Sequence, residues 1–203
     1  AEVAGEHARP GDQQFTLGGD QKENLPELHI IDLGSGMEKT LNDVQGIASI
    51  HRWFPDAAVL LVFQIRAKIT ENSLYQGVLS KVDPATGKAT PLASAIGGNS
   101  VFFDLAPDGK RALFTAAAAG KPDEKLAPPK ETTETLLELD IAAKTVRAIG
   151  KTASLALYSR DGKKVLVGSQ DQGGAGGILE IADPALASFQ RVAEHVALNV
   201  GGG

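Results

Sequence analysis

Ala106-Pro107-Asp108-Gly109-Lys110 is one of three related turns that decide how this chain folds. The other two are Phe54-Pro55-Asp56-Ala57 and Ser159-Arg160-Asp161-Gly162-Lys163. Their aspartates lie 52 (108 − 56) and 53 (161 − 108) residues apart. A near-constant interval of this size is typical of repeat architectures, in which each period builds one structural unit.

Short apolar runs flank each of these turns. The runs that follow the turns are residues 58–63, 112–115 and 165–167, and those that precede them are 50–53, 101–104 and 155–158. Such runs, rich in Val, Leu and Phe and bounded by turn residues, predict strands. Asp-Gly between two of them predicts a hairpin, because the turn needs positive φ. The runs lack clean polar alternation, which is typical of strands covered on both faces.

A second hairpin alternates with the first. Its marker is an aspartate at the end of an apolar run, followed by small residues and then a short strand; the four copies are Asp32, Asp83, Asp140 and Asp183. One period therefore holds four strands, and a four-stranded antiparallel unit that repeats radially is a propeller blade. The sequence predicts an all-β fold, a β-propeller of about four four-stranded antiparallel blades. We expect a single array over residues 1–203, with blades at 8–44, 45–97, 98–150 and 151–194.

Two segments allow a choice. After Asp183 the apolar residues Leu186, Phe189, Ala193, Val196 and Val200 have near-helical spacing, whereas the repeat register predicts a turn and two strands, at residues 189–192 and 196–200. We follow the register. Residues 195–203 either close a small ring beside the first strands or begin a further blade of a larger propeller. Repeat arrays expose apolar faces unless they are capped or closed.

Residues 107–115 read Pro-Asp-Gly-Lys-x-apolar-x-Phe-Thr, and residues 83–88 read Asp-Pro-x-Thr-Gly-Lys. Together these motifs resemble the TolB-type, WD-repeat-like β-propeller repeat. The resemblance covers residues 8–200, with a degraded copy at 9–16. It implies a bacterial envelope setting, periplasmic or extracellular. The resemblance is specific for the fold. It is not specific for the function, because this family serves as a scaffold in many unrelated systems.

Composition excludes several classes of function. The net charge of −5 argues against non-specific binding of nucleic acid, which needs a basic face. The absence of cysteine excludes disulfides and thiol chemistry. No run approaches the ~20 apolar residues of a membrane span. The pairs Lys110-Arg111 and Lys163-Lys164 are expected to be solvated hairpin charges. The histidines show no ligand spacing, so we predict no metal and no cofactor.

One face of the predicted propeller carries variable connections. Those between second and third strands are residues 18–24, 66–73, 116–134 and 170–177. Variable loops on a rigid frame are where binding usually resides, although they can also be tolerated insertions. The longest contains Pro122, Pro128 and Pro129, and is expected to be mobile or docked on a partner.

A second candidate site lies at the mouth of the central channel. His51, Trp53, Asp104 and Tyr158 hold related positions on the innermost strands and are candidate ligand-binding residues. The alternative is that they are ordinary packing and polar positions. The turn aspartates are expected to accept bonds from nearby backbone N–H groups rather than to act in catalysis.

The predicted function is a non-catalytic scaffold that binds a protein partner, or associates with itself, through the variable loop face. The chain would then be a subunit or fragment of a larger assembly. The alternative is the propeller part of an enzyme. The repeat also resembles the substrate-gating propellers of prolyl-oligopeptidase-like hydrolases, and a lactonase-type propeller would carry a channel metal.

Overall fold

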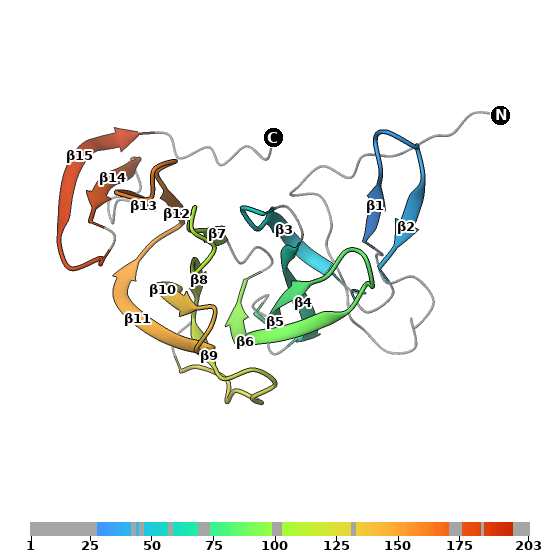
Figure 1. Cartoon of the computed structure of the whole chain (residues 1–203). Coiled ribbons are helices and arrows are strands. Elements are labelled where there is room, and N and C mark those ends of the chain that lie inside the picture. The colour runs from blue at the N-terminus through green and yellow to red at the C-terminus, as the bar shows by residue number, and fades with distance from the viewer. Residues whose placement is uncertain are drawn as a thin grey trace.

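The computed structural model describes residues 28–41, 44, 47–56, 59–68, 74–98, 103–130, 133–170, 176–183 and 185–196. Every regular element within these ranges is a β-strand, and they hold no helix long and apolar enough to cross a membrane. The strands form four antiparallel sheets that stand side by side in an arc (Figure 1). The predicted first hairpin of the first blade falls outside the described residues.

The first sheet pairs β1 (His29–Ile31) with β2 (Glu38–Thr40). The second contains β3 (Ile47–Trp53), β4 (Leu60–Lys68), β5 (Tyr75–Val82), β6 (Ala89–Gly97) and, at its edge, β9 (Ala118–Gly120). The third contains β7 (Phe103–Leu105), β8 (Arg111–Ala116), β10 (Thr135–Asp140) and β11 (Thr145–Thr152). The fourth contains β12 (Leu155–Tyr158), β13 (Val165–Gln170), β14 (Gly177–Ala182) and β15 (Phe189–Val196).

This arrangement confirms the predicted all-β propeller architecture with four-stranded antiparallel sheets. In the third and fourth sheets the four strands lie in sequence order, as in a propeller blade. The arc is open: among the described residues no strand pairing joins the first sheet to the fourth (Figure 1). The choice for residues 195–203, between closing a small ring beside the first strands and beginning a further blade, falls largely on residues 1–27 and 197–203, which lie outside the described residues, so it stays a prediction.

The Asp-Gly turns have the same geometry in the third and fourth sheets. Gly109 and Gly162 have φ of 69° and 68°, a region that favours glycine. In each turn the glycine N–H donates to the carbonyl three residues earlier at 2.8 Å. The carboxylates of Asp108 and Asp161 each accept the N–H two residues on at 3.0 Å. The predicted role of these aspartates in turns is confirmed.

The second set of turns uses aspartate in the same way. Asp32, Asp83, Asp140 and Asp183 each accept a backbone N–H two or three residues further on, at 2.6 to 2.8 Å. A hydroxyl from Ser35, Thr86 or Ser188 also donates to the first, second and fourth of them. These side-chain bonds are the main reason that the pKa of each of those three carboxyls is lowered.

The core lies between the sheets. The second and third sheets pack through Leu61 and Phe63 on one side and Phe114 on the other, all fully buried. The third and fourth pack through Leu113 and Leu136 against a patch of the fourth sheet; the patch includes Ala156, Val165, Val167 and Ala182. Both faces of each middle sheet are thus covered by neighbouring sheets, which explains the near-continuous apolar runs in the strands of the middle sheets.

The long connection between β8 and β10 differs from expectation. It was expected to be mobile or docked on a partner, but its first part forms β9, which pairs antiparallel with β6 of the second sheet. The Gln76 side chain also donates to the carbonyl of Glu124 at 3.0 Å. The connection therefore docks on this chain itself and covers the edge of β6, a strand that would otherwise offer unpaired backbone groups.

The segment after Asp183 follows the repeat register. Leu186 has a φ of 58° and β15 begins at Phe189, so the near-helical spacing of the apolar residues does not produce a helix. The turn and the first predicted strand are confirmed here, whereas the second, at residues 196–200, lies almost entirely outside the described residues. Pairing with β14 decides the conformation, because tertiary contacts override weak local preferences.

Candidate functional site

The four residues predicted for the channel mouth lie on the first strands of three sheets. Trp53 ends β3 and its side chain is 49% exposed. Asp104 lies in β7 and Tyr158 ends β12, and one carboxylate oxygen of Asp104 accepts the backbone N–H of Tyr158 at 2.8 Å. The structure therefore brings Asp104 and Tyr158 together. The side chain of His51 falls outside the described residues, so the four-residue site stays a prediction.

Tyr158 is partly buried between the third and fourth sheets. The guanidinium of Arg111 lies over its ring, 5.9 Å from the centroid. Its hydroxyl is buried and has no hydrogen-bond partner among the described residues. Burial, followed by the negative charge of Glu138, raises the pKa of Tyr158. This phenol therefore stays protonated at neutral pH.

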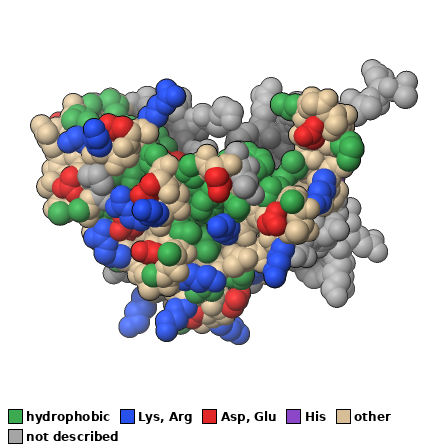
Figure 2. Space-filling view, viewed as in Figure 1, with side chains coloured by type: hydrophobic (Ala, Val, Ile, Leu, Met, Phe, Trp, Pro, Cys, Tyr) green, Lys and Arg blue, Asp and Glu red, His purple; other side chains and the backbone are tan. Residues whose placement is uncertain are grey.

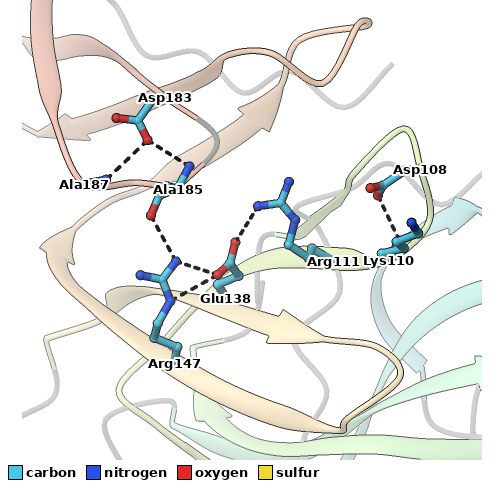
Figure 3. Close-up of polar contacts among 8 residues, drawn as sticks. All are labelled: Asp108, Lys110, Arg111, Glu138, Arg147, Asp183, Ala185 and Ala187. Carbon is cyan, nitrogen blue, oxygen red and sulfur yellow. Dashed lines mark hydrogen bonds and ion pairs between the residues drawn. The ribbon is translucent and has the colours of Figure 1, made fainter.

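Arg111, Glu138 and Arg147 form a charge cluster at the same junction (Figure 3). Arg147 donates from Nε and Nη2 to Glu138 Oε2 at 3.1 and 2.6 Å. Arg111 donates from Nη1 to Glu138 Oε1 at 3.4 Å. Arg147 Nη2 also donates to the carbonyl of Ala185 at 3.2 Å, which ties the third sheet to the fourth. Fork-like bonds to one carboxylate are among the stronger side-chain interactions.

A second ion pair spans the same junction. Lys151 Nζ on β11 lies 2.5 Å from Glu180 Oε2 on β14, and 4.6 Å from the ring centroid of Phe189. The Glu180 side chain is only 11% exposed. The third and fourth sheets are therefore joined by apolar packing and by ion pairs to two nearly buried carboxylates, those of Glu138 and Glu180.

One sequence prediction about these charges was wrong. Arg111 was expected to be a solvated hairpin charge, but its side chain is 31% exposed and paired with Glu138. A signal did exist in the sequence, because Glu138 and Glu180 each interrupt an apolar strand at residues 136–139 and 178–181. A carboxylate at such a position must find a cation or hydrogen bonds.

A cavity of about 310 Å³ opens at the end of the array that carries the Asp-Gly turns, which we call the turn face. Its lining joins the third and fourth sheets and consists of Ala106, Pro107, Asp108, Arg111, Asp161 and Gly162. The two carboxylates are bonded to their own turns, and Arg111 is bonded to Glu138. These groups stabilise the junction. Within the described ranges, no group of three or more His, Asp or Glu side chains is placed to hold a metal ion.

The opposite end of the array, the loop face, carries the connection between β8 and β10. Lys121, Lys125 and Lys130 of this connection are exposed. Lys and Arg side chains project at the lower end of the molecule in Figure 2, where this loop lies in Figure 1. Because β9 anchors the loop to β6, these cations stand on a defined backbone.

Glu134 closes this loop, and its carboxylate accepts the N–H of Gly98, the residue directly after β6. Burial raises the pKa of Glu134 above its usual value of 4.5, so its charge opposes folding above that pH. We expect Glu134→Gln, which keeps an acceptor oxygen, to raise the melting temperature at pH 7 by about 1–2 °C. The difference from wild type should shrink as pH falls toward 4.5 in calorimetric scans.

Glu194→Gln is the matched control, because the Glu194 side chain is 50% exposed. It should leave the melting temperature nearly unchanged at both ends of the pH range. A Glu134→Gln variant that melts below wild type at pH 7 would contradict the assignment of a desolvated carboxylate.

No family model matches this chain, and neither does any curated protein. Solved structures do. TolB from Acinetobacter baumannii aligns with a TM-score of 0.59 at 22% identity, over 83% of this chain and 37% of that one. An uncharacterised protein from Listeria monocytogenes aligns with a TM-score of 0.54 at 11% identity, over 85% of this chain and 48% of that one. An acylaminoacyl peptidase from Pyrococcus horikoshii aligns with a TM-score of 0.53 at 13% identity, over 83% of this chain and 28% of that one.

This chain therefore spans less than half the length of each of these three proteins. At these identities the likeness concerns the fold, which TolB and a peptidase share. The described sheets and the alignment with TolB agree on one architecture. The resemblance predicted from the turn motifs is confirmed: the chain has a TolB-like β-propeller fold.

Proposed function

We propose that this chain is a non-catalytic propeller scaffold that binds a protein partner through its loop face, within a larger assembly and in an envelope setting. The observation that carries the proposal is the anchored connection between β8 and β10. A mobile loop would lose conformational entropy on binding, whereas a loop already paired to β6 loses less.

The exposed lysines of this loop suggest the chemistry of the partner. Lys121, Lys125 and Lys130 stand within ten residues on an otherwise acidic chain. A local excess of cations favours binding to an acidic surface on a partner protein, and it increases the rate of association at low salt. The nearby Asp123 and Glu124 limit this field, and the Glu124 carboxylate is bonded to the Lys121 N–H. The partner would therefore recognise a shaped mixed-charge surface.

Site-specific photocrosslinking tests this proposal. A photoreactive residue replaces the exposed Ala127 on the loop face, and a matched probe replaces the exposed Ala142 in the β10–β11 turn on the turn face. In a bacterial envelope extract, the Ala127 probe should yield one dominant adduct that mass spectrometry identifies as a single protein. The Ala142 probe should not yield it.

Charge reversal provides the second arm. Changing Lys121, Lys125 and Lys130 to Glu should reduce the adduct at least about tenfold at low salt, with little change in melting temperature. Adducts of equal yield from both faces, or an adduct insensitive to the charge reversal, would contradict binding through the loop face.

A further inference from the structure

The same leucine pair recurs on three sheets of the array. Its members lie on the second and third strands, on the face directed toward the following sheet: Leu61 and Leu79, Leu113 and Leu136, and Leu166 and Leu179. The first two pairs are fully buried, because the following sheet covers them. The third pair is only partly buried. The fourth sheet therefore carries a face equivalent to those that, on the second and third sheets, pack against the following sheet.

The rest of that face is apolar as well. Leu157 on β12, Leu166 on β13 and Ile181 on β14 lie opposite one another in register, and all three are partly exposed. Their neighbours Val165, Val167 and Ala182 point to the other side, toward the third sheet. We call the surface formed by Leu157, Leu166, Leu179 and Ile181 the outward face.

Apolar side chains are also exposed at the other end of the array. Ile31, Leu33 and Met37 of the β1–β2 hairpin are 57%, 96% and 72% exposed. Ile31 points away from the second sheet, because its neighbour Ile30 packs toward it. Figure 2 shows hydrophobic side chains at this end of the molecule. These are three of the five large hydrophobic side chains exposed among the described residues.

We propose that the outward face of one chain packs against the β1–β2 end of a second copy of this chain, head to tail. The proposal rests on the part of the proposed function that places the chain in a larger assembly, but it uses a different surface. A second copy is the occupant because one chain carries both apolar ends. It would continue the sheet-on-sheet packing already present between the second, third and fourth sheets.

The number of sheets favours closure of two copies over an open filament. A head-to-tail contact repeats until the rotation closes. The described residues of each chain form four sheets, so two copies bring eight, which is within the range of about four to eight blades that propellers use. Such a dimer contains two equivalent contacts, each joining an outward face to a β1–β2 end.

Sedimentation velocity of the full chain tests the proposal across about 1 to 100 µM. The wild-type chain should pass from 21.1 kDa to twice that mass as concentration rises. Leu166→Arg on the outward face and Ile31→Glu on the hairpin should each weaken the dimer at least about tenfold, since each alters both contacts. A wild-type chain that stays monomeric throughout overturns the proposal.

Mixing the two variants distinguishes head-to-tail packing from a symmetric contact. In a mixed pair, one contact carries both substitutions and the other carries neither, so an equimolar mixture should regain a dimer. Two outward faces packed on each other would gain nothing from mixing, and that result overturns the proposal. Circular dichroism checks that each variant is folded. If Leu166→Arg does not fold, Ile181→Arg probes the same face, and the mixing result must hold for it.

Discussion

Leu113→Ala should lower the free energy of unfolding by about 3 kcal/mol, while Leu166→Ala should lower it by about 1 kcal/mol. The two leucines hold equivalent positions on β8 and β13. Leu113 is fully buried under the fourth sheet, so its truncation leaves a cavity. Leu166 is partly exposed on the outward face, so less apolar surface returns to water and no closed cavity forms.

Urea unfolding followed by circular dichroism measures both losses, with the fluorescence of Trp53 as an independent probe. The comparison must be made well below the concentration at which the chain associates, because a docked second copy would add to the cost of Leu166→Ala. Equal losses for the two variants at low concentration would show that the outward face is as well covered as the junction between the third and fourth sheets.

The turn motifs could predict the fold because their physics is local. Asp108 and Asp161 bond to their own turns, and the glycines that follow them supply the positive φ of a tight hairpin. The interval between the turns then reveals the repeat without knowledge of any long-range contact. The register of the repeat also predicted the conformation at Leu186 correctly. The local spacing of apolar residues suggested a helix there, but the structure has a turn before β15.

The pairing of β9 with β6 could not be predicted in this way. Ala118 follows β8 of the third sheet but pairs with Ile96 in the second sheet, and β9 is three small residues whose local sequence has no strand signal. The proline content of the loop suggested mobility. Its conformation depends instead on an unpaired edge in another part of the chain, which only the assembled sheets reveal.

The candidate site was partly predictable. Asp104 and Tyr158 were grouped because they hold related register positions, and they do meet, although through a backbone N–H rather than as two facing side chains. The charge cluster was missed because Arg111 follows a lysine directly after a turn, a typical place for solvated cations. The carboxylate that recruits it, Glu138, lies 27 residues away on β10. Its isolation within an apolar strand was the usable signal.

Removing both arginines of the charge cluster should have the second large effect. In Arg111→Ala/Arg147→Ala, Glu138 keeps a side chain that is only 11% exposed but loses both cations. A charge left buried without a partner costs about 3 kcal/mol, because the Coulomb attraction that offset its desolvation is gone. We expect this loss in urea unfolding at pH 7, with a separation of the third and fourth sheets visible as increased hydrogen exchange in β12 and β13.

Two comparisons isolate the buried charge. Adding Glu138→Leu to the double variant removes the stranded carboxylate, and should restore most of the lost stability because an apolar residue suits this junction. Arg191→Ala breaks the pair with Glu194, whose side chains are 55% and 50% exposed, and should cost less than about 1 kcal/mol. If the double variant costs no more than Arg191→Ala, or if Glu138→Leu restores nothing, water reaches Glu138 and the cluster is an ordinary surface network. If both comparisons give the expected results, ion pairs stabilise the junction between the third and fourth sheets. The junction between the second and third sheets, where Phe63 packs near Phe114, is held by apolar packing instead.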